Sequence, residues 1–443
     1  MPNVLNLKPE EIDTKEKRSN ILVSVVGCGQ KGILFANAFA DAGFKVTCTD
    51  TNLSLIKKVA KGKTSSSEPE IEAKLKSLIN TGQLNATSEL KKAVGQSDVI
   101  IITVPVKIDD KKKIDYSEAI IACKQVAAAL RPGTLVLYCN IAAFGFNEGT
   151  MKETLENTSG LKAGSDFGLA YIPLQTSETQ YPSQMTNLEL KVAAVGKTSL
   201  DDVTNILSKI TKNVKPISDV KTAELATLFT VARKDTSTAL ANELAVFCES
   251  ASVDFFEVLK LIDFADKSFW PIAVEEETKN EAYLLLENAE NINVRLRLSE
   301  LSRQTNEDMV KHAVNLTQDA LRSCNKTLRR ARVAVLGTVN HATGIFVKML
   351  ELKGAKVSAY DPLLKRETAD FGIAKTSNLN EAVEGADCIV IIALEEQFKS
   401  LNLKKIKALT KTPAVIVDLA GAFEPKIVET EGFIYRGLGR GTE

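Results

Sequence analysis

Three glycines at fixed spacing, Gly27, Gly29 and Gly32, lie between an apolar run and a helix-like segment near the start of the chain. A glycine turn after a strand presents free backbone N–H groups at a helix N-terminus, where they bind phosphate. The first glycine permits the tight turn, the second lets the backbone approach a pyrophosphate, and the third lets the helix pack against the strand. A second apolar run ends at Asp50, whose carboxylate suits a ribose diol and disfavours a 2′-phosphate. The pattern predicts a site for NAD rather than NADP; glycines that serve packing alone are the alternative.

The predicted cofactor site continues into the end of a later apolar run at 99–104. Carboxyl ends of parallel strands carry the nicotinamide-side contacts of such sites, which brings in Thr103-Val104-Pro105. The predicted cofactor-binding residues are Gly27, Cys28, Gly29, Gln30, Lys31, Gly32, Asp50, Val104 and Pro105. The spacing assigns no catalytic residue. It assigns no metal ligand either, because the chain has two histidines and seven scattered cysteines.

Strand-like runs that alternate with helical patterns must position these residues. The clearest predicted strands are at 21–26, 45–49, 99–104, 134–138 and 190–195, and again at 388–393 and 414–419. Between 218 and 325 the apolar residues recur at helical spacing, and 222–249 is long enough for about 40 Å of helix. From about 330 the strand, glycine, helix and strand pattern returns, and it ends at Asp361.

This organisation predicts an α/β protein with two doubly wound Rossmann-like domains joined by a central all-helical domain. The predicted parts are a loose N-terminal arm at 1–19, an NAD-binding domain at 20–212, a central helical domain at 213–327 and a second Rossmann-like domain at 328–443. Long apolar helices between two lobes are often buried against a partner subunit. We therefore expect a homodimer that forms through the central helices.

Composition excludes several other classes of protein. Over 443 residues the chain has 56 basic and 56 acidic residues, so its net charge gives no sign of a nucleic-acid or membrane-surface partner. The polar first 19 residues are unlike a signal peptide, and no apolar stretch is long enough to span a bilayer. The scattered cysteines read as small buried thiols in a reducing compartment, which favours a cytoplasmic location.

Several motifs follow one another in a specific order along nearly the whole chain. They are VVGCGQKG with Asp50, Lys61-Gly62-Lys63 through Glu68-Pro69, Asp98-Val99 through Val104-Pro105 with Asp115-Tyr116-Ser117, Thr222-Ala223-Glu224, 239–245, 333–337, Tyr360-Asp361-Pro362 and 435–441. This order, from about residue 20 to 441, resembles the UDP-glucose/GDP-mannose dehydrogenase family of nucleotide-sugar dehydrogenases. The resemblance implies that the second Rossmann-like domain is similar to a nucleotide-sugar-binding domain.

Enzymes of that family oxidise a sugar's primary alcohol to a carboxylate in two NAD-dependent steps. The chemistry needs a cysteine nucleophile, a lysine and an asparagine for the oxyanion, and an acid and a threonine for protons and water. In this chain no cysteine lies between Cys248 and Cys324, and the resemblance places Glu277 near the cysteine position and Glu281 at the following aspartate. Thr227 and Val231 stand at the positions of the lysine and the asparagine.

Other positions depart in the same way. The family's threonine corresponds to Ile141, its Pro-Glu-Arg to Pro173-Leu174-Gln175, and its second-lobe lysine to His341. The sequence therefore favours a relative that binds NAD and lacks the four-electron machinery, acting in a non-catalytic or regulatory role. An NAD-dependent two-electron oxidoreductase and a conventional UDP-sugar 6-dehydrogenase with relocated groups are the alternatives.

Each remaining candidate has a functional and a structural interpretation. The candidates are the acidic cluster Glu275-Glu276-Glu277 with Lys279, a phosphate contact at His341, Arg233-Lys234-Asp235 on the long helix, the Phe269-Trp270 pair, and Arg436 and Arg440 near the C-terminus. The structural interpretation of the acidic cluster is a solvated helix start, and that of the long-helix charges is an exposed helix face. For the aromatic pair it is a packing or dimer anchor rather than a base-stacking platform. For His341 it is a surface residue, and for Arg436 and Arg440 it is a mobile terminal tail.

Overall fold

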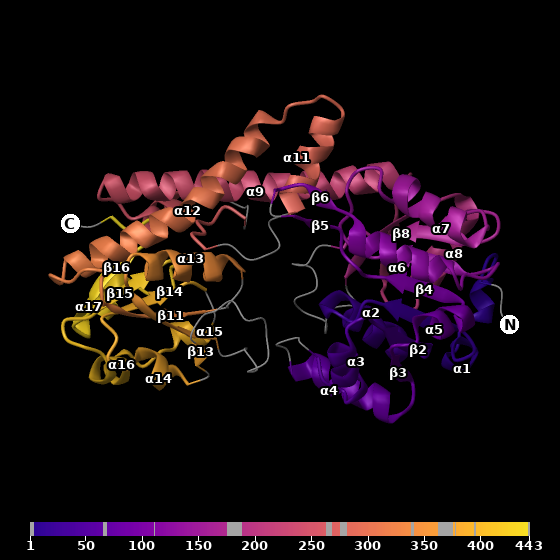
Figure 1. The fold of residues 1–443 in the computed structure, drawn as a ribbon, viewed down its shortest axis with the longest axis horizontal. Coiled ribbons are helices and arrows are strands. Elements are labelled where there is room, and N and C mark those ends of the chain that lie inside the picture. The colour runs from indigo at the N-terminus through magenta and orange to yellow at the C-terminus, as the bar shows by residue number, and fades with distance from the viewer. Residues whose placement is uncertain are drawn as a thin grey trace. The chain divides into compact units, whose positions relative to one another are not determined.

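The computed structural model describes residues 4–64, 69–109, 111–174, 188–262, 268–274, 281–337, 341–361, 375–376, 378–393 and 396–441. Figure 1 traces the chain through its sheets and the helices beside them. Its contacts divide it into two compact units, Met1–Thr230 with Tyr283–Val294, and Val231–Ala282 with Arg295–Glu443. The predicted four-part division at 19, 212 and 327 stays a prediction.

The first unit is built around an eight-stranded sheet in the order β10-β9-β8-β7-β4-β1-β2-β3. Its strands are β1 Leu22–Val26, β2 Lys45–Thr49, β3 Leu84–Thr87, β4 Val99–Ile102, β7 Leu135–Tyr138, β8 Gly168–Tyr171, β9 Glu189–Ala194 and β10 Asn213–Pro216. All neighbours run parallel except β8 and β9. The apolar runs are continuous because a sheet with helices on both faces buries every side chain of its inner strands.

Several helices and a short hairpin also belong to this unit. The elements are α1 Lys15–Arg18, α2 Gln30–Asp41, α3 Leu53–Ala60, α4 Pro69–Asn80, α5 Leu90–Gln96, β5 Lys107–Ile108, β6 Ile114–Asp115, α6 Ser117–Ala127, α7 Lys152–Ser159 and α8 Lys197–Leu207. The strand order reverses on either side of β1, with β2 and β3 on one side and β4, β7 and β8 on the other. Such a switch point is where doubly wound sheets bind ligands, outside the carboxyl ends of the strands.

The expectation of a loose N-terminal arm is wrong for the described part of it. Val4, Leu7 and Ile12 are buried in the core of the first unit. The N–H groups of Asn6 and Leu7 donate to the Asp202 carboxylate at 3.0 and 3.1 Å. These three apolar side chains are not spaced with a helical or strand period, so the sequence gave no sign that they are buried. Burying each of them nevertheless stabilises the folded state, because it removes apolar surface from water.

The second unit is built around a six-stranded, fully parallel sheet, whose strand order is β13-β12-β11-β14-β15-β16. Its strands are β11 Arg332–Leu336, β12 Lys356–Tyr360, β13 Lys375–Thr376, β14 Cys388–Ile391, β15 Val415–Asp418 and β16 Ile434–Gly437. The helices beside them are α13 His341–Leu352, α14 Leu379–Val383, α15 Glu396–Lys399, α16 Leu403–Leu409 and α17 Pro425–Thr430.

The middle of the chain is helical, as predicted. Its helices are α9 Val220–Ser250, α10 Phe255–Leu261, α11 Glu281–Asn291 and α12 Arg297–Arg322. Within the second unit α9 and α12 are joined by a buried ion pair, with the Arg303 guanidinium 2.6 Å from the Asp235 carboxylate. The predicted fold class, Rossmann-like α/β domains with a central helical region, is therefore confirmed. None of the described helices combines the length and apolar character needed to cross a membrane.

Candidate functional site

The glycine turn lies at the switch point of the first sheet, directly after β1. Gly27 has a φ of +100°, which a side chain would strain, and its N–H donates to Thr49 O at 2.8 Å. Helix α2 begins at Gln30, and no side chain caps its N-terminus at Gly29. Gly29 and Gln30 are both exposed. The N-terminal end of α2 therefore faces outward, where an anion can meet its N–H groups and dipole.

Two glycines of the turn have different steric roles. A Cβ on Gly32 would lie 1.9 Å from Gly27 O, so only glycine lets α2 pack this close to the turn. A Cβ on Gly29 would meet no described atom within 4 Å, apart from its chain neighbours. The space outside Gly29 is thus open, as a pyrophosphate site requires.

Asp50 is held beside the turn by backbone donors. Its two oxygens accept from the N–H of Cys28 and the N–H of Asn52, both at 2.8 Å. A carboxylate has about four acceptor sites, so capacity for a ribose diol is retained. The open turn and this half-buried acid at the end of β2 fit an NAD molecule.

The segment after β4 is fastened to the same turn. Thr103 Oγ1 donates to Gly27 O at 2.9 Å, and Tyr138 Oη donates to Val104 O at 3.2 Å. Val104 is half-buried and Pro105 is exposed. The structure thus brings the predicted 103–105 segment to the turn, and the contact of Val104 and Pro105 with cofactor stays a prediction.

Lys31 leaves the turn in a direction that the sequence did not indicate. Its Nζ donates to Asn140 Oδ1 at 2.5 Å and to Leu174 O at 2.9 Å. These partners follow β7 and β8, at the carboxyl edge of the sheet. The Lys31 side chain therefore extends from the glycine turn along the carboxyl edge of the sheet, towards the ends of β7 and β8.

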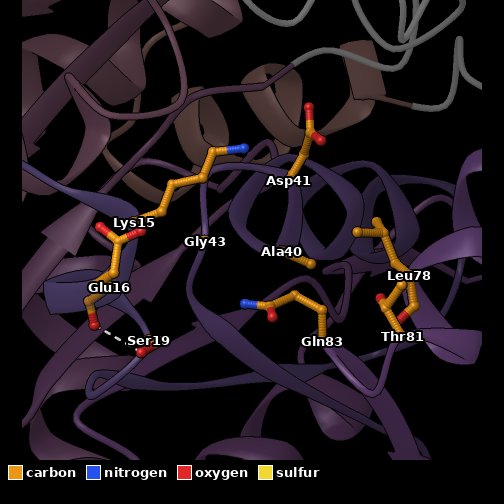
Figure 2. A pocket seen from close by; sticks show the side chains of 9 residues that line it. All are labelled: Lys15, Glu16, Ser19, Ala40, Asp41, Gly43, Leu78, Thr81 and Gln83. Carbon is orange, nitrogen blue, oxygen red and sulfur yellow. Dashed lines mark hydrogen bonds between the residues drawn. The ribbon is translucent and has the colours of Figure 1, made fainter.

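The hollow drawn in Figure 2 is not part of this site. It has a volume of about 400 Å³ and is lined by residues such as Lys15, Asp41 and Gln83. Asp41 is the last residue of α2, at the opposite end of that helix from the glycine turn.

Known proteins match the chain along most of its length. Models of the UDP-glucose/GDP-mannose dehydrogenase family match at residues 21–214, for the NAD binding domain, and at 343–425, for the UDP binding domain. A UDP-N-acetyl-D-mannosamine dehydrogenase of Pyrococcus horikoshii is 30% identical over 433 residues, covering 95% of this chain and 99% of that relative. The chain belongs to the UDP-glucose/GDP-mannose dehydrogenase family.

Solved structures agree with this assignment. A UDP-D-ManNAc dehydrogenase from Pyrococcus horikoshii superposes with a TM-score of 0.83 at 28% identity, covering 95% of this chain and 100% of that chain. An NDP-N-acetyl-D-galactosaminuronic acid dehydrogenase from Methanosarcina mazei Go1 gives 0.74 at 26%, covering 98% of both chains. The family's NAD-binding domain confirms NAD as the cofactor, and its UDP binding domain supports a nucleotide-sugar ligand.

The residues that the sequence analysis sets opposite the family's reactive groups are packing residues where the structure describes them. Ile141 and Leu174 are buried, and Val231 is half-buried. Thr227 is buried, and its hydroxyl donates to Ala223 O of its own helix at 2.9 Å. Glu275, Glu276, Glu277, Lys279 and Gln175 lie outside the described residues, as does the side chain of His341.

Glu224 is a buried acid on α9 that the sequence placed only within a family motif. It accepts from Gly145 N at 2.6 Å, and from the N–H and Nδ2 of Asn147 at 3.0 and 2.8 Å. Burial raises the pKa of this carboxyl, although the three donors favour its charged form. The acid thereby anchors α9 to the loop after β7.

All seven cysteines of the chain are buried. Cys248 and Cys324, which flank the segment where the resemblance predicts the family's nucleophile, belong to separate hydrophobic clusters. Burial raises the pKa of both thiols, raises the pKa of Cys123 to about 12, and raises the pKa of Cys139 well above its usual range. Among the described residues there is also no group of acids, cysteines and histidines arranged to hold a metal ion.

Several of the other charged and aromatic candidates pack against neighbouring side chains, whereas Arg233 is exposed. Asp235 is buried with Arg303, and Arg440 pairs with Asp254 while its guanidinium lies 4.5 Å from the ring centroid of Phe256. Asp254, Phe256 and Arg440 all belong to the second unit. Phe269 and Trp270 contact the rings of Phe255 and Phe256, as expected of an anchor.

Proposed function

We propose that this protein binds NAD and a nucleotide-sugar without oxidising the sugar to an acid, and that it acts as a non-catalytic or regulatory member of its family. The burial of every thiol in the chain carries the proposal. Four-electron oxidation passes through a thiohemiacetal, which requires a thiolate that the substrate can reach.

The oxyanion side of the reaction supports the same conclusion. Thr227 and Val231 replace the lysine and asparagine that the family uses, and neither carries a positive charge or an amide donor. Losing one such donor typically raises the barrier by about 3–4 kcal/mol, although such losses are not additive. Ile141 and Leu174 remove two further polar groups from the sheet edge.

The binding side of the ancestral site is retained. We propose that Gly27, Cys28, Gly29, Gln30, Lys31, Gly32, Asp50, Val104 and Pro105 contact NAD. The two relatives named above act, by their names, on N-acetylated amino sugars linked to nucleotides. UDP-N-acetylmannosamine is therefore the first ligand to test.

Calorimetric titration with NAD, then with UDP-N-acetylmannosamine and a panel of other UDP- and GDP-sugars, tests the proposal. The expected result is saturable binding of NAD and of at least one sugar nucleotide, with no rise in the NADH absorbance band. Formation of one NADH per sugar would replace the proposal with a two-electron oxidoreductase, and about two NADH per sugar would restore the family's own reaction. No binding of NAD at millimolar concentration would refute the cofactor site.

We also propose a homodimer through the central helices. Leu240, Leu244 and Phe247 are exposed on α9 at successive spacings of four and three residues, which places them on one helix face. Leu298 and Leu301 are exposed on α12 of the same unit. Sedimentation analysis of wild type and F247D tests this: a dimer that dissociates in the variant is expected, and a monomeric wild type would contradict it.

Seven buried, unpaired thiols suit a reducing compartment, so we propose a cytoplasmic location. Fractionation of the source cells tests this, and recovery of the protein outside the cytoplasm would contradict it.

A further inference from the structure

Lys31 differs from the other residues of the glycine turn because its side chain is committed to a second part of the sheet edge. The ammonium donates to Asn140 Oδ1 and Leu174 O at 2.5 and 2.9 Å. Ile141 N donates to the same Asn140 oxygen at 2.9 Å. Lys31 therefore contacts the same two short segments that hold Ile141 and Leu174, where the family has polar reactive groups.

These contacts place the ammonium on a defined half of the dinucleotide site. Asp50, at the end of β2, marks the half that holds the adenosine ribose. Asn140 and Leu174 follow β7 and β8, which lie on the other side of β1. In a doubly wound fold the dinucleotide crosses the switch point, so the nicotinamide lies on this second half.

Hydrogen bonds hold the ammonium in place. Asn140 Nδ2 donates to Thr103 O at 3.1 Å, and Thr103 Oγ1 donates back to Gly27 O at 2.9 Å. Asn140 is 5% exposed, so this network is shielded from water. Burial raises the pKa of the neighbouring Cys139 thiol, and the Lys31 charge opposes that rise.

We propose that Lys31 is a positioning residue whose charge makes the site prefer NADH over NAD⁺. The proposal rests on the NAD site proposed above and deepens it. The two forms of the cofactor differ in net charge by the positive nicotinamide ring of NAD⁺, and a fixed ammonium on the same half of the site repels that ring. A protein without turnover that carries this preference would respond to the reduced fraction of the cofactor pool.

The ratio of the dissociation constants for NAD⁺ and NADH isolates this effect, since adenosine and pyrophosphate contacts cancel in it. We would measure both constants by titration for wild type, K31M, K31Q and K31R. K45M is the matched control, because Lys45 is an exposed lysine at the opposite end of β2. Each variant's fold is checked by its urea unfolding curve, and K31Q replaces K31M if the latter does not fold.

In wild type we expect NADH to bind about tenfold more tightly, which corresponds to about 1.4 kcal/mol. K31M and K31Q should bring the ratio towards one, whereas K31R and K45M should retain it. An equal loss of affinity for both forms in K31M would mean that Lys31 only supports the turn, and an unchanged ratio would likewise overturn the inference. Failure of wild type to bind either form would instead refute the NAD site itself.

Discussion

Substituting two glycines of the same turn by alanine separates folding from cofactor binding. In G32A the new methyl group would lie 1.9 Å from Gly27 O and 3.1 Å from Thr103 Oγ1, whereas ordinary contacts begin at 3.4 Å. Because the closer atom belongs to the backbone, α2 must move away from the turn. Overpacking of this kind costs about 1–3 kcal/mol, and we expect the upper end of that range.

In G29A the methyl group meets no described atom, and the φ of −67° at this position suits alanine. The loss of a glycine N-cap should cost only about 0.5–1 kcal/mol of stability. The methyl group nevertheless enters the space through which a pyrophosphate approaches the N–H groups of α2. We therefore expect NAD affinity to fall at least about tenfold, or about 1.4 kcal/mol.

Urea unfolding and calorimetric titration with NAD measure the two effects on the same preparations. The expected outcome is a less stable G32A that binds NAD weakly and a near-native G29A that also binds it weakly. A G32A protein as stable as wild type would show that the helix and turn are not in such close contact. Native NAD affinity in G29A would show that the pyrophosphate lies elsewhere.

Two further predictions concern buried charges. R303M removes the Arg303 ion pair of the buried Asp235 carboxylate, so the free energy of unfolding in urea should fall by about 3–5 kcal/mol. K311M, at an exposed ion pair, is the control and should change the free energy of unfolding by under about 1 kcal/mol. Equal effects of the two substitutions would contradict this prediction. Because burial raises the pKa of Glu224, the native state binds its proton more tightly, and wild type should lose stability relative to E224Q as pH rises from the usual carboxyl pKa to the raised one. A pH-independent difference between urea midpoints would refute that assignment.

Local patterns were sufficient to predict much of the fold. The strand predicted at 45–49 is β2 Lys45–Thr49, and the helix predicted at 222–249 is α9 Val220–Ser250. Both signals come from the spacing of apolar residues, which parallel strands and long helices impose directly on the sequence. The glycine turn was equally readable, because Gly27 and Gly32 are required by backbone geometry.

Contacts between segments that are far apart in the sequence could not be predicted from such local patterns. The burial of Val4 and Ile12 depends on a core assembled from other parts of the chain. The direction of Lys31 depends on Asn140, 109 residues away, and a long flexible side chain leaves no periodic trace. Arg440 was similarly a candidate nucleotide contact in the sequence, and only the folded structure shows its ion pair with Asp254.

The central claim is that this member of the family binds its ligands without the ancestral oxidation. Its most direct test is the amount of NADH formed per UDP-N-acetylmannosamine with protein in excess over sugar and NAD in excess over both. The Pyrococcus horikoshii relative serves as the positive control. Saturable binding of both ligands with no NADH formed is the predicted result, whereas about two NADH per sugar would contradict the account.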